Sequence, residues 1–124
     1  MRLLFDTNTI INFLKQKEAA IDLSSLLLKH ECFTSIIVKL ELLKYPDISQ
    51  DEEDNIIEFL QFIPIIPLNE TIENEIIALS RASKLKLPDA IIGATAIEFN
   101  AKVVTQDPHF LNCKYKKLQI WEND

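Results

Sequence analysis

Hydrophobic positions along the chain follow two alternating patterns. Short, mostly apolar runs predict buried strands at residues 3–5, 32–34, 65–66 and 103–104, and residues 118–121 are expected to form a last edge strand. Between these runs, apolar residues recur every three or four positions, which predicts helices over residues 9–15, 19–29, 36–45, 50–62, 69–85 and 88–100. Strands that alternate with helices are typical of a parallel sheet covered by helices, so we expect an α/β fold.

Residues that start or stop helices support these boundaries. Ser35 can cap the helix that follows it, and Pro46 ends that helix. Ser49 and Glu52 have the spacing of a capping box, in which each side chain binds a backbone N–H of the other residue. Pro88 suits the first turn of a helix, where its missing N–H costs nothing.

The composition fits one globular domain spanning residues 1–124. Hydrophobic residues make up 48% of the chain and charged residues 26%, which allows a core to form without disulfides. Cys32 and Cys113 are expected to be reduced thiols, because two cysteines form no disulfide framework. No signal peptide is recognisable, and no apolar stretch approaches the roughly 20 residues of a membrane span. We therefore expect a soluble, cytoplasmic protein without membrane contact.

The formal net charge of −6 narrows the possible functions. It argues against a broad nucleic-acid-binding surface, which is normally basic. It remains compatible with an enzyme that gathers acids in a metal site and keeps its basic residues on a rim.

Two aspartates follow predicted strands. Asp6 comes directly after the first strand, and Asp107 comes just after the strand that ends near Thr105. Ligands of open α/β sheets bind beyond the carboxyl ends of the strands, so both aspartates stand where a site is expected. The ordinary alternative is equally simple, because aspartate is common in loops and caps helices well.

Two more acids lie in predicted helices. Glu41 belongs to a helix that is apolar nearly all round, where a carboxylate needs a partner or a metal ion unless it is solvated beside Lys39 or Lys44. Asp89 stands in a helical first turn, which is favourable to the helix dipole by roughly 0.3–1 kcal/mol without any further role. Gly93, the one glycine of the chain, lies in the same helix and indicates a close approach of another backbone or room beside a site.

A cluster of these four acids would have a defined chemistry. Two carboxylates about 4 Å apart repel each other by roughly 4 kcal/mol at an effective dielectric constant of 20, so the ionised cluster calls for a cation. Oxygen-only ligands favour Mg²⁺ or Mn²⁺, which can activate water and orient a phosphodiester. The charges alone leave hydrolysis, phosphotransfer and simple ion binding open.

Four segments resemble, in order, the motifs of PIN domains. They are residues 5–11 (FDTNTII), the helix around Glu41, residues 87–96 (LPDAIIGATA) and residues 103–110 (VVTQDPHF). The resemblance covers essentially the whole chain, and within the family the chain is similar to the VapC-like toxins of toxin–antitoxin pairs. Gly93 and Gln106 depart from the residues that are common at their positions, and neither departure removes an acid.

The resemblance carries further expectations. It implies a three-layer α/β/α sandwich with a central, mainly parallel sheet, and Mg²⁺- or Mn²⁺-dependent cleavage of RNA. It implies that the protein forms a homodimer and that its partner is a small protein antitoxin. By motif position, Asp6, Glu41, Asp89 and Asp107 would hold the metal and carry catalysis, Asn8 would support Asp6 by a hydrogen bond, and Thr105 would be a polar neighbour of the site.

Basic residues near Asp89 and Asp107 are weaker candidates. Arg81, Lys84 and Lys86 could form a rim that binds RNA phosphates, or could simply complement a helix dipole. A second cluster, Lys114, Lys116 and Lys117, also fits a plain surface loop. For His109 we expect a structural role rather than general base catalysis, since no nucleophile accompanies it.

Two other functions compete with the nuclease. A catalytically inactive PIN-like module that binds RNA or protein is the main alternative, although such a module has no need of an acidic cluster. A phosphotransfer domain is a third possibility. Its phosphatase form needs Asp-x-Asp after the first strand, where this chain has Asn8, and its receiver form needs an adjacent acidic pair.

Overall fold

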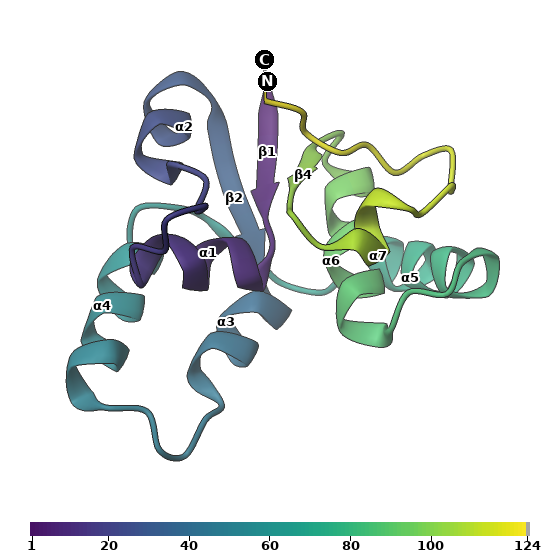
Figure 1. Ribbon diagram of the computed structural model, residues 1–124. Helices are drawn as coiled ribbons and strands as arrows, with labels where there is room; N and C mark the ends of the chain where they lie inside the picture. The colour runs from purple at the N-terminus through teal and green to yellow at the C-terminus, as the bar shows by residue number, and fades with distance from the viewer. Residues whose placement is uncertain (124) are drawn as a thin grey trace.

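The computed structural model describes residues 1–123 and contains a sheet of parallel strands between layers of helices (Figure 1). Its strands are β1 (Arg2–Phe5), β2 (Glu31–Ser35), β3 (Ile65–Ile66) and β4 (Lys102–Val104), arranged in the order β3-β2-β1-β4. Each neighbouring pair is parallel. Its helices are α1 (Thr7–Leu14), α2 (Leu23–Lys29), α3 (Ile36–Leu43), α4 (Gln50–Leu60), α5 (Glu70–Ala82), α6 (Leu87–Glu98) and α7 (Pro108–Leu111).

Helices cover both faces of the sheet. Figure 1 shows α1, α2 and α4 on one side of the strands, and α5 and α6 together on the other. The core consists of the strand residues and the helix faces turned toward them, with Leu3, Leu4, Phe5, Val103 and Val104 all 0% exposed. Burying each such side chain contributes roughly 1.5–3 kcal/mol, which explains the apolar runs in the sequence. The predicted α/β/α sandwich with a parallel sheet is confirmed.

The register of the central strands brings two chain segments together at one edge of the sheet. Phe5 of β1 is paired with Val104 of β4, so both strands end at the same level. Just beyond them, the Asp6 N–H donates to the carbonyl oxygen of Val104 over 3.3 Å. The residues that follow β1 and β4 are therefore neighbours in space, as the rule for parallel sheets predicts.

Most elements lie where the apolar pattern places them. The strand over residues 65–66 is confirmed, and so is the capping box, with Ser49 Oγ accepting from Glu52 N and Glu52 Oε1 accepting from Ser49 N. The helix predicted over residues 19–29 begins only at Leu23, because the Asp22 side chain accepts from Ser24 N and caps the helix there.

Two terminal features differ from the prediction. Residues 118–121 form no regular strand; Ile120 makes a single parallel bridge to Val103 beside β4. The short helix α7 was not predicted, although Asp107 caps it and Pro108 begins it, a combination that marks helix starts. A four-residue helix is too short to give a periodic apolar pattern, so only its capping residues could have predicted it.

The glycine in α6 makes room for side chains rather than for another backbone. A Cβ atom on Gly93 would lie 2.9 Å from Leu79 Cδ2 of α5 and 3.4 Å from Leu118 Cδ1. The close approach of another backbone that the sequence indicated is therefore absent at Gly93 in the described chain, and side chains of α5 and the C-terminal segment pack there instead. In the described part of the chain, no helix is both long and apolar enough to cross a membrane.

Candidate active site

Asp6 is anchored at the end of β1 as the N-cap of α1. Its side chain is buried, and Oδ1 accepts a hydrogen bond from Thr9 N over 2.9 Å while Oδ2 accepts one from the Thr105 hydroxyl. Burial raises the pKa of the Asp6 carboxyl, the bonds from Thr105 and Thr9 lower this pKa in part, and the charge of Asp107 raises it again. The net shift of the pKa is upward.

Asp107 is fixed by the same threonine from the other side. The Asp107 N–H donates to Thr105 Oγ1 over 3.0 Å, so one buried hydroxyl links the segments after β1 and β4. The Asp107 carboxylate accepts from His109 N over 2.9 Å, and its Oδ1 also contacts His109 Nδ1 at 2.9 Å. The Thr105 hydroxyl thus acts as a positioning group for both aspartates.

Glu41 reaches the site from the middle of α3. Its Oε1 accepts a hydrogen bond from Thr7 Oγ1 over 2.6 Å, and Thr7 is the first residue of α1. The side chain is half-buried rather than solvated beside Lys39 or Lys44, both of which are exposed. Thr7 was not predicted as a functional residue, since its partner lies 34 positions away in the sequence.

Asp89 lies in the first turn of α6 and leaves the helix end uncapped. The N-cap is Lys86, and no side chain makes a capping hydrogen bond there. The pKa of the half-buried Asp89 carboxyl is raised, first by its burial and then by the charges of Asp107, Glu41 and Asp6. The four acids therefore interact electrostatically in the folded chain.

These acids line one small cavity of about 100 Å³. Its walls come from four separate segments of the chain: Asp6, Thr7, Asn8, Ile11, Glu41, Tyr45, Asp89, Ile92 and Asp107. Among the described residues, no lysine or arginine forms an ion pair with any of the four acids. The cavity is thus an acidic centre whose four carboxylates form no ion pair with a lysine or arginine of the described residues.

The donor set fits a hard divalent cation in kind. The candidate ligands are all carboxylate oxygens, which Mg²⁺ and Mn²⁺ prefer. The carboxylates are not yet arranged as a complete metal site. Within residues 1–123, no set of three or more Asp, Glu, His or Cys side chains is close enough to hold an ion. Binding would require the less constrained carboxylates to turn toward the ion.

The supporting residues are distributed differently from the prediction. Asn8 lines the cavity, but the hydrogen bonds to Asp6 come from Thr9 and Thr105 and not from Asn8. Arg81 and Lys86 are exposed and lie outside the cavity, as does Lys84, which lines a neighbouring hollow. A local motif does not reveal which of its polar residues faces the acid.

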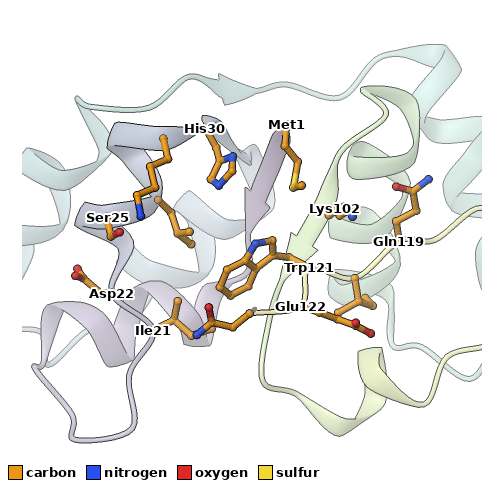
Figure 2. A pocket seen from close by; sticks show the side chains of 13 residues that line it. Met1, Ile21, Asp22, Ser25, His30, Lys102, Gln119, Trp121 and Glu122 are labelled. Atoms are coloured by element: carbon orange, nitrogen blue, oxygen red, sulfur yellow. The ribbon is translucent and has the colours of Figure 1, made fainter.

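Among the hollows described within residues 1–123, the one with the largest volume lies elsewhere. It measures about 940 Å³ and lies at the amino ends of the strands, where Met1 precedes β1, His30 precedes β2 and Lys102 begins β4. Figure 2 shows the Trp121 indole in the middle of this hollow. None of the four acids lines it, so the size of a cavity does not locate the site in this chain.

Comparisons with known proteins identify the domain family and the fold. The model of the PIN domain matches residues 3–114. A chain of a toxin–antitoxin complex from Klebsiella pneumoniae is 27% identical, with a TM-score of 0.75 over 95% of this chain and 99% of that one. A chain of VapBC-1 from nontypeable Haemophilus influenzae is 25% identical, with a TM-score of 0.77 over 98% of both chains.

The fold likeness extends to more distant sequences. A chain of VapBC2 from Rickettsia felis, bound to a DNA fragment from its promoter, is 20% identical and has a TM-score of 0.82 over the full length of both chains. Curated protein sequences give no significant match. With a family match over residues 3–114 and its acids gathered beyond the ends of β1 and β4, the chain belongs to the PIN domain family.

Proposed function

We propose that the protein is a Mg²⁺- or Mn²⁺-dependent endoribonuclease that hydrolyses RNA phosphodiesters at the four-carboxylate cavity. Membership of the PIN family supports a nuclease-type role. The observation that carries the proposal is that Asp6, Glu41, Asp89 and Asp107 come from four segments and line one cavity without a lysine or arginine partner in the described chain. Such an arrangement costs stability unless a cation joins it.

The residues divide into fixed and adjustable acids. Asp6 and Asp107 are held by Thr105, Thr9 and His109 and would bind the ion in a set position. Glu41 has one hydrogen bond, from Thr7, and Asp89 lies in an uncapped helical turn, so these two can turn toward the ion and the water. A bound divalent ion would lower the pKa of its water and stabilise charge on the phosphate.

An inactive binding module is the less economical explanation. A protein that only binds RNA gains nothing from a half-buried acidic cluster, which repels phosphate when no metal is present. The raised pKa values of Asp6 and Asp89 are the signature of groups kept in an unfavourable environment, which is commonest at functional sites.

We further propose that the protein acts as a toxin inhibited by a small protein antitoxin. The support is its likeness to chains of the toxin–antitoxin complex of Klebsiella pneumoniae and of VapBC-1 of Haemophilus influenzae. A homodimer stays a prediction from the family resemblance. Arrest of growth on expression, relieved by coexpression of a small protein encoded beside the gene, is the expected outcome in cells.

Cleavage of a pool of cellular RNAs tests the catalytic proposal. We expect cleavage with Mg²⁺ or Mn²⁺, none with EDTA, and a loss of at least about 100-fold in Asp6→Asn or Asp107→Asn, the scale of removing charge stabilisation from an active site. Asp22→Asn is the matched control, since Asp22 is an exposed helix cap outside the cavity and asparagine caps equally well. Full cleavage by Asp6→Asn would overturn the proposal.

A further inference from the structure

A second hollow lies near the acidic cavity and is lined by apolar, basic and aromatic residues. This side hollow, of about 410 Å³, lies between the end of α5, the segment before α6 and helix α7. Its walls include Lys84, Leu85, Pro108, His109, Asn112 and Lys114. A volume of this size is in the usual range of about 300–1,000 Å³ for small-ligand sites, and it suits one nucleotide.

His109 connects the side hollow to the proposed active site. His109 is one of the residues that line the side hollow, and its Nδ1 lies 2.9 Å from Asp107 Oδ1 at the acidic cavity. A third, open hollow has Asn8 and Asp107 in common with the acidic cavity, and Pro108 and His109 in common with the side hollow. Lys17 also lines this third hollow. A strand that crossed the acids could therefore enter the side hollow without leaving the surface.

The His109 ring is held in place and yet open to ligand. Its side chain is 71% exposed, while the contact with Asp107 fixes the orientation of the imidazole. An exposed aromatic ring with a fixed orientation is a stacking surface for an unpaired base, and histidine is among the residues that serve this purpose. Leu85 and Pro108 add apolar surface on which the base can rest.

The rim of the side hollow has basic residues available for phosphate. Lys84 and Lys114 are exposed, and neither takes part in an ion pair within the described part of the chain. Lys117, in contrast, is bound to Glu75 at 3.2 Å. In a chain with a net charge of −6, two such lysines beside the acidic cavity form a local exception to the overall charge.

We propose that the side hollow binds one unpaired nucleotide of the RNA substrate, next to the phosphodiester that is cut. This proposal rests on the proposed ribonuclease function. The base lies against His109, Leu85 and Pro108, and a phosphate lies between Lys84 and Lys114. An intact double helix cannot place a base there, so the nucleotide that occupies the side hollow must be unpaired.

Binding in EDTA tests this proposal without any cleavage. The probe is a fluorescent single-stranded RNA of eight nucleotides, whose affinity is measured by anisotropy at several salt concentrations. The double variant Lys84→Gln/Lys114→Gln is expected to bind at least about fivefold more weakly. The slope of log affinity against log salt should fall by about 0.7, because the variant no longer neutralises the one phosphate that lies between the two lysines.

The control removes the same charge at the far end of the sheet. Lys29→Gln/Lys102→Gln changes two lysines of the hollow in Figure 2, and it should leave both affinity and salt slope unchanged. Equal losses in the two double variants would contradict the proposal, because they would indicate a general charge effect. Thermal unfolding followed by circular dichroism checks that each variant is folded.

Cleavage kinetics separate this proposal from the function on which it rests. If the wild type cleaves RNA, Lys84→Gln/Lys114→Gln should raise KM for the single-stranded RNA at least about fivefold, because the variant binds the phosphate beside the cut more weakly. Cleavage with unchanged KM and unchanged affinity would refute the side hollow and leave the nuclease intact. Loss of affinity in a protein that cuts no RNA would support the side hollow and refute the nuclease.

Discussion

The hydroxyl of Thr7 donates a hydrogen bond to Glu41 Oε1 over 2.6 Å, and it thereby joins the first turn of α1 to the middle of α3. This bond is the one side-chain hydrogen bond that holds Glu41 within the described residues. Because Thr7 directly follows Asp6, the bond fixes the spacing between two of the four acids. Thr7 is therefore a positioning residue of the proposed active site.

Removing the Thr7 hydroxyl should weaken metal binding and cleavage together. A hydrogen bond to a charged group contributes about 1.5–3 kcal/mol, so we expect Thr7→Val to lower kcat/KM at least about tenfold. The Mg²⁺ concentration for half-maximal activity should rise, while KM for RNA changes little. Thr7→Ser keeps the hydroxyl and should recover most of the activity; equal losses in both variants would point to packing instead.

Neutralising Asp89 should stabilise the metal-free protein while it abolishes cleavage. Burial and the neighbouring acids raise the pKa of the Asp89 carboxyl, so the folded state binds its proton more tightly than the unfolded state does. Stability is then lost as the pH rises through the raised pKa. At pH 7 in EDTA, Asp89→Asn should raise the free energy of unfolding, measured in urea, by about 1 kcal/mol, a usual size for a stabilising substitution.

Unfolding measured at lower pH and with Mg²⁺ tests whether the gain in stability of Asp89→Asn comes from the lost carboxylate charge. This gain should shrink as the pH falls toward 3.8, the ordinary pKa of aspartate, where the wild-type carboxyl is also protonated. Saturating Mg²⁺ should stabilise the wild type more than the variant. Asp47→Asn, at an exposed position outside the cavity, should change little. A loss of stability in Asp89→Asn at pH 7 without metal would contradict the prediction.

The buried hydroxyl of Thr105 should matter for both folding and cleavage. Thr105→Val leaves Asp6 Oδ2 and the Asp107 N–H without a partner, at a cost of roughly 1–3 kcal/mol in the free energy of unfolding. Cleavage should fall as well, because Asp6 and Asp107 lose their common anchor. Thr105→Ser retains the hydroxyl, so urea unfolding and cleavage should show a smaller loss than in the valine variant.

The two cysteines should differ in reactivity. Burial raises the pKa of the Cys32 thiol to about 11, and its Sγ donates to the carbonyl oxygen of Leu26 at 3.5 Å. At pH 8 iodoacetamide should modify the half-buried Cys113 well before Cys32 in the folded protein, and both equally in urea. Mass spectrometry of the peptides measures this, and equal rates in the folded state would contradict the burial of Cys32.

The positions of the strands and of three acids followed from simple regularities. Apolar runs placed β1 and β4, and the parallel sheet rule then placed Asp6 and Asp107 together beyond their ends. Glu41 was marked by its apolar helix. These predictions of position succeeded because burial and the alternation of strands with helices follow from local sequence patterns.

Contacts between distant segments could not be predicted in the same way. The bond between Thr7 and Glu41 depends on how α1 crosses α3, which no spacing encodes. Asn8 was expected to support Asp6, yet the helix turn directs the Thr9 N–H toward that carboxylate. The late start of α2 was decided by Asp22, a capping residue inside an otherwise periodic stretch.

The link between Thr105 and Asp6 also has a consequence for synthesis on the ribosome, since these residues are 99 positions apart. A growing chain that ends before β4 leaves one edge of β1 unpaired and Asp6 without its threonine, and it lacks Asp107 altogether. The acidic cavity is therefore assembled only after β4 and Asp107 have been translated. A cell that makes this protein meets it as a nascent chain without a complete site until that point of synthesis.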